Sequence, residues 1–184
     1  RLLFKAPLGL FFPKLGENGK TIQILIATAD KGGKAMRKEV SLAKDVAAAK
    51  PLQLTTENMA RLANQLMNEP YGWGGLGQRR DCSSTLMDLL APFGVWLPRN
   101  SSHQAHEAGT FIDLTNFSPE EKEKMIMKQG IPYFTLLWLK GHIMLYIGNR
   151  DGHALVFHNF WSVRTWDGDG NRGKKIIGRA AITT

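Results

Sequence analysis

The sequence predicts an α+β fold, because helical patterns occupy one stretch of the chain and strand-like patterns occupy the next. Apolar residues recur at helical spacing within residues 55–130, whereas residues 133–183 contain short apolar runs of strand length. Residues 1–47 contain strand-like runs and glycine turns of their own, which are too few for a complete small β-barrel. We therefore expect a partial β domain with its linker over residues 1–47, followed by an α+β domain over residues 55–184.

The individual elements follow from local patterns. The apolar residues between Met59 and Met67 predict a helix that Thr56 can begin. Ser118 and Pro119 are typical N-cap and first-turn residues, so a later helix is expected to run from there to about residue 130. A short apolar helix is expected between them, at residues 85–90. The expected strands lie at residues 21–28, 39–42, 133–139, 142–147 and 155–161, with two short ones near 175–177 and 180–183.

Composition excludes several classes of protein. The chain has 184 residues, with 24 Lys and Arg against 16 Asp and Glu, for a net charge of +8. It contains one Cys, which excludes an intrachain disulfide framework and a multi-cysteine zinc site, and no metal or other cofactor is expected. No apolar run approaches the roughly 20 residues that a transmembrane helix needs.

The positive charge is concentrated at the N-terminal end. Residues 1–50 contain ten Lys and Arg and four Asp and Glu, a net charge of +6, whereas residues 51–184 carry +2. Such a segment favours an anionic partner, such as a cell-wall polymer, membrane headgroups or nucleic acid, unless it only improves solubility. Nucleic acid is not expected, because the aromatic residues do not alternate with a basic stripe.

Cys82 is the candidate nucleophile. It lies at the expected start of a helix, after a glycine-rich loop and close to Arg80, Asp81 and two serines. The unpaired N–H groups and partial positive charge of a helix N-terminus favour a thiolate, so the pKa of Cys82 is expected below its ordinary value of about 8.5. The same N–H groups are suited to stabilise an oxyanion. The alternative is a buried, inert cysteine.

A nucleophilic thiol needs a histidine base, and the base needs a residue that orients it. His142 begins an expected strand, and a hairpin turn follows that strand. If the hairpin loop consists of residues 149–151, His142 lies directly opposite His158 on one face, and His153 lies on the other face. This spacing selects His158 as the partner, and a one-residue slip in register would undo the selection.

Four motifs occur in order along the chain. They are Pro-Tyr-Gly-Trp-Gly-Gly at 70–75, Asp-Cys-Ser at 81–83, Leu-Pro-Arg-Asn-Ser-Ser-His-Gln at 97–104 and Gly-His-Ile-Met-Leu-Tyr-Ile-Gly at 141–148. Together they resemble the NlpC family of bacterial cell-wall cysteine peptidases. The resemblance covers about residues 55–184 and implies a papain-like catalytic domain, with helices packed on an antiparallel sheet. The preceding residues resemble part of a bacterial SH3-like domain.

The resemblance implies hydrolysis of peptidoglycan stem peptides at the bond between D-γ-glutamate and a diamino acid. The residues that it assigns to catalysis, as nucleophile, base and orienting residue, are Cys82, His142 and His158. Those that it assigns to substrate binding are Tyr71, Asp81 and Ser83. Asp81 is suited to bind a free L-Ala amine, because an ammonium group needs a carboxylate, and it is equally suited to cap the helix. Core packing is the alternative role for Tyr71.

Two departures from the family pattern leave the substrate open. Ser84 stands where the family usually has Gly, and residues 109–140 stand where a Gly-Asp-Leu segment is usual ahead of the catalytic His. One alternative is an amidase or acyltransferase of the same fold that acts on another substrate. The other is a non-catalytic wall-binding module that uses the basic N-terminal part.

The expected partners are peptidoglycan stem peptides and, through the basic N-terminal region, an anionic cell-wall polymer. Such a protein is expected in the periplasm, in the cell envelope or outside the cell. Because the chain begins at Arg1 rather than Met, we expect a processed form or part of a longer protein. A signal peptide or a further domain ahead of it would not be visible.

Overall fold

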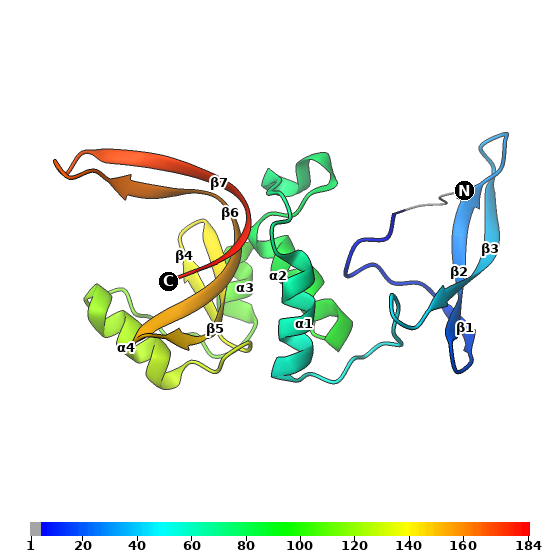
Figure 1. The fold of residues 1–184 in the computed structure, drawn as a ribbon, viewed down its shortest axis with the longest axis horizontal. Helices are drawn as coiled ribbons and strands as arrows, with labels where there is room; N and C mark the ends of the chain where they lie inside the picture. Colours follow the sequence, from blue (N-terminus) through cyan, green and yellow to red (C-terminus); the bar gives the residue numbers. More distant parts are fainter. Residues whose placement is uncertain (1–4) are drawn as a thin grey trace.

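Two groups of elements, joined by extended segments, make up the structure (Figure 1). The structure is a computed structural model that describes residues 5–184, so residues 1–4 of the predicted β domain lie outside the described residues. The predicted α+β class is confirmed, because the helices precede and pack on a four-stranded antiparallel sheet. A separate three-stranded sheet comes before them.

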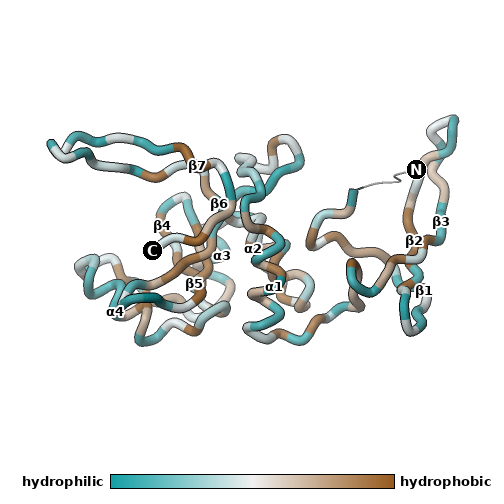
Figure 2. The backbone as a smooth tube through the Cα atoms, in the orientation of Figure 1, coloured by the Kyte–Doolittle hydropathy of each residue, from teal (hydrophilic) through white to brown (hydrophobic). Residues whose placement is uncertain are grey.

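The three-stranded sheet has a small hydrophobic core of its own. Its antiparallel strands, in spatial order, are β1 (Lys14–Glu17), β2 (Thr21–Ala29) and β3 (Ala35–Ala43). Ile22, Ile24 and Ile26 alternate along β2 and are buried on one face, since successive side chains of a strand point to opposite faces. Val40 and Leu42 of β3 pack against them, and Figure 2 shows the apolar residues along β2. An SH3-like identity for this sheet stays a prediction.

The helices of the larger group position the candidate site. The predicted helices are confirmed as α1 (Thr56–Leu66), α2 (Cys82–Leu90) and α4 (Pro119–Gln129). The unpredicted ones are α3 (Ser101–Glu107) and the 3-10 helices η1 (Trp73–Gln78) and η2 (Ala91–Phe93). Sequence patterns missed α3 because it has no apolar stripe, and its one fully buried side chain is the polar Gln104.

The four-stranded sheet carries the candidate histidines. Its strands, in spatial order, are β4 (Leu136–Leu139), β5 (His142–Arg150), β6 (His153–Trp166) and β7 (Arg172–Thr183). Helix α2 packs on β5 and β6, and the buried side chains of Leu86, Leu89, Ile143 and Phe157 fill the core between them. The two short strands expected at the C-terminal end are one long strand. Residues 162–176 of β6, β7 and their turn extend beyond the sheet as a largely hydrophilic β6–β7 arm (Figures 1 and 2).

Buried Arg80 ties the N-terminal segment to the larger group. Its guanidinium group donates to the carbonyl oxygen of Leu8 at 2.7 Å and to Asp88 at 2.7 Å, and it also pairs with Glu69. Leu8 and Leu52 pack against the core of the larger group. The boundaries predicted at residues 47 and 55 remain predictions.

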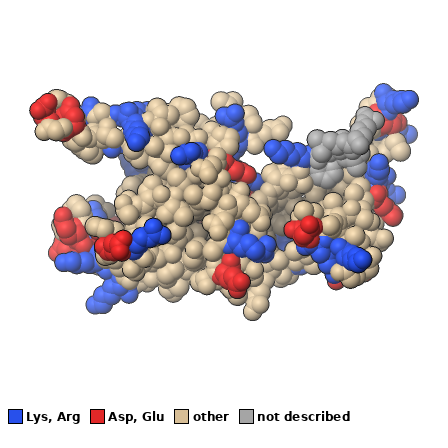
Figure 3. Space-filling model, viewed as in Figure 1, with Lys and Arg blue, Asp and Glu red and all other residues tan. Residues whose placement is uncertain are grey.

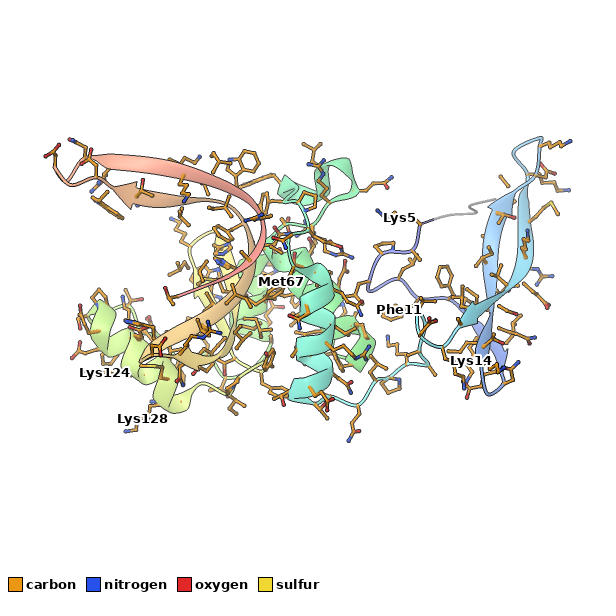
Figure 4. The ribbon with its side chains drawn as sticks, viewed as in Figure 1. Lys5, Phe11, Lys14, Met67, Lys124 and Lys128 are labelled. Atoms are coloured by element: carbon orange, nitrogen blue, oxygen red, sulfur yellow. The ribbon has the colours of Figure 1, made fainter. Side chains whose placement is uncertain are left out.

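Residues 109–140 include α4 and β4 and line an apolar groove between these two elements. Ser118 caps α4 by accepting a hydrogen bond from the N–H of Glu121 at 3.3 Å, and the Glu121 carboxylate accepts one from the N–H of Ser118 at 2.9 Å. Lys124 and Lys128 extend from α4 away from the sheet (Figure 4), while its other side borders an apolar groove shared with β4. Within residues 5–184, no helix combines the length and the apolar character needed to span a bilayer.

Candidate active site

Cys82 is the first residue of α2, and Asp81 is the N-cap before it. The Asp81 carboxylate accepts a hydrogen bond from the N–H of Ser84 at 2.9 Å, and the Ser84 hydroxyl accepts one from the N–H of Asp81 at 2.9 Å. This reciprocal cap gives a physical reason for Ser at position 84, because a glycine would lose half of it. The buried side chains of Leu86 and Leu89 anchor the helix, so the thiol is held at a well-defined helix start.

Burial decides the protonation state of the Cys82 thiol. Burial raises the pKa of Cys82, and the nearby Asp81 carboxylate raises it further. Hydrogen bonds from the backbone N–H groups of Ile143, Ser83 and Cys82 itself lower this pKa but do not outweigh burial. The neighbouring Arg80 does not help, because it pairs with two carboxylates, as described above. The prediction of a lowered pKa is therefore wrong, and the resting sulfur is a thiol at neutral pH.

His142, His158 and Thr183 form a hydrogen-bonded row. Nε2 of His142 lies 2.8 Å from Nδ1 of His158, and Nε2 of His158 lies 3.1 Å from the hydroxyl oxygen of Thr183. The backbone N–H of Ile143 donates to the sulfur, so Cys82 lies at the start of β5, where His142 is the residue before Ile143. Nδ1 of His142 makes no hydrogen bond within the described part of the chain, so it is the ring nitrogen that is free to take up a proton.

Only one arrangement of protons along the row of His142, His158 and Thr183 lets His142 accept the proton of the thiol. Nδ1 of His142 must then carry the lone pair, so its Nε2–H donates to Nδ1 of His158. Nε2 of His158 consequently carries its proton and donates to the hydroxyl of Thr183. Sequence reasoning missed Thr183, because a threonine near the end of a strand has no motif of its own.

Both imidazoles are neutral at neutral pH. Burial lowers the pKa of His142, and burial together with the nearby His142 lowers the pKa of His158 to about 3. Phe160 stacks on the ring of His158 with centroids 3.9 Å apart and planes at 11°, which covers one face of that ring. A neutral imidazole at His142 is able to accept a proton near neutral pH, as a general base must.

The two histidines share a face of the sheet, but the predicted register is wrong in detail. The hairpin loop is Asp151-Gly152, because Arg150 pairs with His153. Both loop residues have positive φ, 53° and 82°, as a two-residue Asp-Gly turn requires. A β-bulge between residues 146 and 148 then shifts the register by one, so that Leu145 pairs with Phe157.

The bulge determines which partner His142 meets. Continuing the register from the Leu145–Phe157 pair puts His142 opposite Phe160, and His158 is its diagonal neighbour on the same face. The rings of His142 and Phe160 lie 6.4 Å apart, which fits this placement. The sequence thus selects the right partner, although the two histidines are not directly opposed.

Asp81 and Ser83 lie together with Arg99, which the sequence reasoning did not select. Two guanidinium nitrogens of Arg99 lie 2.6 and 3.1 Å from the Asp81 carboxylate oxygens, and one of them donates to the Ser83 hydroxyl at 2.9 Å. Although burial raises the pKa of Asp81, hydrogen bonds from Arg99 and Ser84 outweigh it and hold the pKa below its ordinary value. The sequence feature that could have identified Arg99 as a site residue was its position in the Leu-Pro-Arg-Asn motif.

Tyr71 lies within electrostatic range of the thiol. Burial raises its pKa to about 12, and the charges of Cys82 and a nearby carboxylate contribute, so its hydroxyl stays protonated. The centroid of its ring lies 6.4 Å from that of Trp73 and 6.4 Å from that of Trp161. Trp73 is 75% exposed and Trp161 is 47% exposed, so this aromatic row lies at the surface rather than in the core.

The remaining histidines lie outside this group. His153 faces Glu123 of α4 at 3.4 Å, and His103 and His106 are exposed on α3. Among residues 5–184, no three or more His, Cys, Asp or Glu side chains are grouped so as to hold a metal ion. The structure therefore brings together Cys82, His142, His158, Tyr71, Asp81 and Ser83 around the start of α2 and β5.

Comparisons with known proteins bear on this arrangement. The sequence profile of the NlpC/P60 family matches residues 68–160. Among solved structures, an NlpC/P60 endopeptidase from Photobacterium damselae subsp. piscicida is 29% identical, with a TM-score of 0.74, and the match covers 95% of this chain. The chain spans only 40% of that protein's length.

An NlpC/P60 family protein from Bacillus cereus ATCC 10987 is 16% identical, with a TM-score of 0.45 over 90% of this chain and 48% of the other. Among curated proteins, no sequence matches significantly. The family profile covers half of the chain, including Cys82, His142 and His158. The chain therefore belongs to the NlpC/P60 family.

Proposed function

We propose that this protein is a cysteine endopeptidase that hydrolyses peptidoglycan stem peptides at the bond between D-γ-glutamate and a diamino acid. The observation that carries the proposal is the 2.8 Å hydrogen bond between His142 and His158, at the strand start whose next N–H reaches the Cys82 sulfur. Membership of the NlpC/P60 family, whose members are generally cell-wall peptidases, supports the peptidase class. We place the activity in the periplasm, in the envelope or outside the cell, where peptidoglycan lies.

The first half of the reaction forms a thioester. Nδ1 of His142 takes the proton of the Cys82 thiol as the sulfur attacks the γ-carbonyl carbon of D-glutamate. The carbonyl oxygen becomes an oxyanion, to which the N–H groups at the start of α2 and the protonated hydroxyl of Tyr71 donate. The C–N bond then breaks, and His142 returns the proton to the amine of the diamino acid.

The second half releases the acyl group. A water molecule gives a proton to Nδ1 of His142 and attacks the thioester carbon, and the C–S bond breaks as the sulfur regains a proton from the imidazolium. His158 and Thr183 hold His142 in the required tautomer throughout. Because both the thiol and the imidazole start neutral, the thiol proton has to move to His142 before or during the attack.

Substrate contacts are proposed for Tyr71, Asp81 and Ser83 on the side of the thiol away from the leaving group. Asp81 already carries a cation partner in Arg99, so an L-Ala amine would have to share this carboxylate. Arg99 is 49% exposed and is therefore accessible to a carboxylate of the stem peptide. This cluster would recognise a peptide that bears both charges.

The experiment is digestion of purified stem peptides, with and without their sugars, followed by mass spectrometry. New termini at D-glutamate and at the diamino acid are expected for the wild-type protein. Cleavage between sugar and L-Ala would instead identify an amidase. A product in which the acyl group is joined to an added amine or alcohol would identify an acyltransferase. Binding without turnover would indicate that the protein is a non-catalytic wall-binding module.

Matched variants test the residues. Cys82→Ala and His142→Asn are expected to abolish turnover, while His153→Asn, which changes an exposed histidine of the same hairpin, is expected to retain it. Wild-type turnover by Cys82→Ala would overturn the proposed mechanism. Thermal unfolding of each variant shows whether lost activity reflects chemistry or lost folding.

A further inference from the structure

The β6–β7 arm is an exposed extension that the catalytic proposal does not use. Its strands pair from Ser162–Ile176 to Trp166–Arg172, beyond the part of the sheet that the helices cover (Figure 1). Isolated two-stranded ribbons are only marginally stable, so such an arm is costly unless it contacts something. Its length and exposure are therefore a reason to ask what it binds.

One face of the arm combines three cations and a tryptophan. Arg164 lies directly opposite Lys174, and Trp166 lies directly opposite Arg172, two residues further along the same face. All four are exposed, and Trp166 is 62% exposed. Like charges directly opposite each other destabilise a hairpin. Within residues 5–184, none of the three cations forms an ion pair.

Neither acidic residue of the arm, Asp167 or Asp169, forms an ion pair with these cations within residues 5–184. Asp167 accepts hydrogen bonds from the N–H of Asn171 at 2.7 Å and from its side-chain amide at 3.1 Å, which commits its carboxylate to the turn. Figure 3 shows acidic side chains at the tip of the arm and basic ones along its length. The net charge of residues 51–184 gave no sign of this basic face, because acidic residues elsewhere in that part of the chain offset its charge.

The arm is continuous with the candidate active site. Strand β6 carries His158 in its inner half and continues into the arm, and Trp161 at the base of the arm contacts Tyr71 beside the thiol. A long polymer that is bound at the site can therefore extend along the arm and contact it. Peptidoglycan offers both carboxylates, which pair with Lys and Arg, and sugar rings, against which an exposed indole ring packs.

We propose that the Arg164, Trp166, Arg172 and Lys174 face of the β6–β7 arm binds the peptidoglycan polymer outside the stem peptide that is cleaved. This inference rests on the proposed function for its choice of polymer. The arm holds the enzyme on the insoluble wall, while Cys82 acts on one peptide at a time. The basic N-terminal sheet, which the sequence favoured for this role, is the natural comparison.

The test is co-sedimentation of the full chain with purified peptidoglycan sacculi, performed with Cys82→Ala so that no turnover occurs. The triple variant Arg164→Gln, Arg172→Gln, Lys174→Gln is expected to weaken binding roughly tenfold, the effect of losing three exposed charge contacts. Trp166→Ala is expected to weaken binding by itself. Added salt is expected to weaken binding of the parent protein more than binding of the triple variant.

The matched control removes the same charge from the N-terminal sheet, as Lys34→Gln, Arg37→Gln, Lys38→Gln, three exposed residues of β3 and its preceding turn. Binding that survives this change but not the arm change supports the proposal. Equal losses in the two variants would show a net-charge effect and overturn it, as would sedimentation unaffected by the arm change. Melting temperatures of both variants exclude unfolding as the cause.

A parallel sedimentation with phosphatidylglycerol vesicles separates wall from lipid. If the arm change abolishes vesicle binding but leaves sacculus binding intact, the arm is a membrane contact and the proposal fails. The stem-peptide assay judges the proposed function independently, because sedimentation needs no turnover. A protein that cleaves stem peptides but does not sediment with sacculi would refute the arm proposal alone.

Discussion

Nε2 of His142 lies 2.8 Å from Nδ1 of His158, on adjacent strands whose register is shifted by a β-bulge. This contact leaves Nδ1 of His142 as the only ring nitrogen that can serve the thiol. It also makes His158 an acceptor at Nδ1 and a donor at Nε2, whose N–H donates a hydrogen bond to the Thr183 hydroxyl. With its two-residue loop and its bulge, the hairpin thus places the two imidazoles so that one nitrogen of each is a donor and the other an acceptor.

Replacing His158 tests whether an acceptor is needed beside His142. His158→Phe keeps a ring but removes the acceptor, so His142 loses its orientation, and kcat is expected to fall about 10²–10⁴-fold, the range that general base catalysis supplies. His158→Asn offers a carbonyl oxygen and is expected to retain part of the activity. Steady-state kinetics on a stem peptide provide the measurement, and equal activities of the two variants would contradict the assignment.

Thr183 is expected to be a positioning residue. Thr183→Val has nearly the same shape but leaves the Nε2–H of His158 without its partner, and kcat is expected to fall about tenfold, the cost of one partly buried hydrogen bond. Thr183→Ser restores a hydroxyl and is expected to recover most of the activity. A merely structural role would make both variants equally active, because both keep the strand.

The reactivity of Cys82 is expected to rise at alkaline pH. Because burial raises the pKa of this thiol, alkylation by iodoacetamide is expected to be slow near pH 6 and to accelerate only above the ordinary thiol pKa of about 8.5. Mass spectrometry after timed quenching follows the reaction, and Cys82 is the only cysteine in the chain. Rapid labelling near pH 6 would mean that the resting enzyme holds a thiolate–imidazolium pair.

Burial of His158 is expected to make the fold sensitive to acid. The pKa of His158 is about 3 in the folded protein, against about 6.5 in an unfolded chain, so the unfolded chain binds the proton more readily between these values. The contribution of neutral His158 to the free energy of unfolding is therefore fully present above pH 6.5, and it is lost as the pH drops toward 3. Urea unfolding across this window measures the slope.

His158→Asn removes the group whose pKa is lowered, so its stability is expected to fall less steeply with acid. His153→Asn, which changes an exposed histidine, is the control and is expected to keep the wild-type slope. A His158→Asn slope equal to that of the wild type would show that His158 does not cause the acid sensitivity.

Asp81 is expected to contribute both a helix cap and a charge. Asp81→Asn keeps the cap on Ser84 but loses the ion pair with Arg99, whereas Asp81→Ala loses both. Asp81→Ala is therefore expected to be less stable than Asp81→Asn by about 1 kcal/mol, the usual worth of an N-cap. Urea unfolding compares them, and equal stabilities would show that the cap adds nothing here.

Features set by neighbouring residues were predictable from the sequence. Asp81 and Ser84 cap α2 through bonds that span three residues, so the position of Cys82 at a helix start followed from the local pattern. Ser118 and Pro119 likewise marked the start of α4. Alternation along β5 and β6 was enough to put His142 and His158 on one face. The Asp-Gly loop moves the register by an odd number of residues from the predicted one, and the one-residue bulge returns the two histidines to the same face.

What the tertiary structure decided depends on residues far apart in the chain. The thiol pKa was misjudged because a helix N-terminus acts within one turn, whereas burial depends on how β5 and β6 cover α2. Arg99 reaches Asp81 across 18 residues, and Thr183 reaches His158 across 25. Sequence by itself determined which residues are candidates for the chemistry and which local elements hold them, since capping and periodicity are local. Only the packed fold decided their protonation, orientation and partners, because desolvation and long-range hydrogen bonds exist only once distant segments meet.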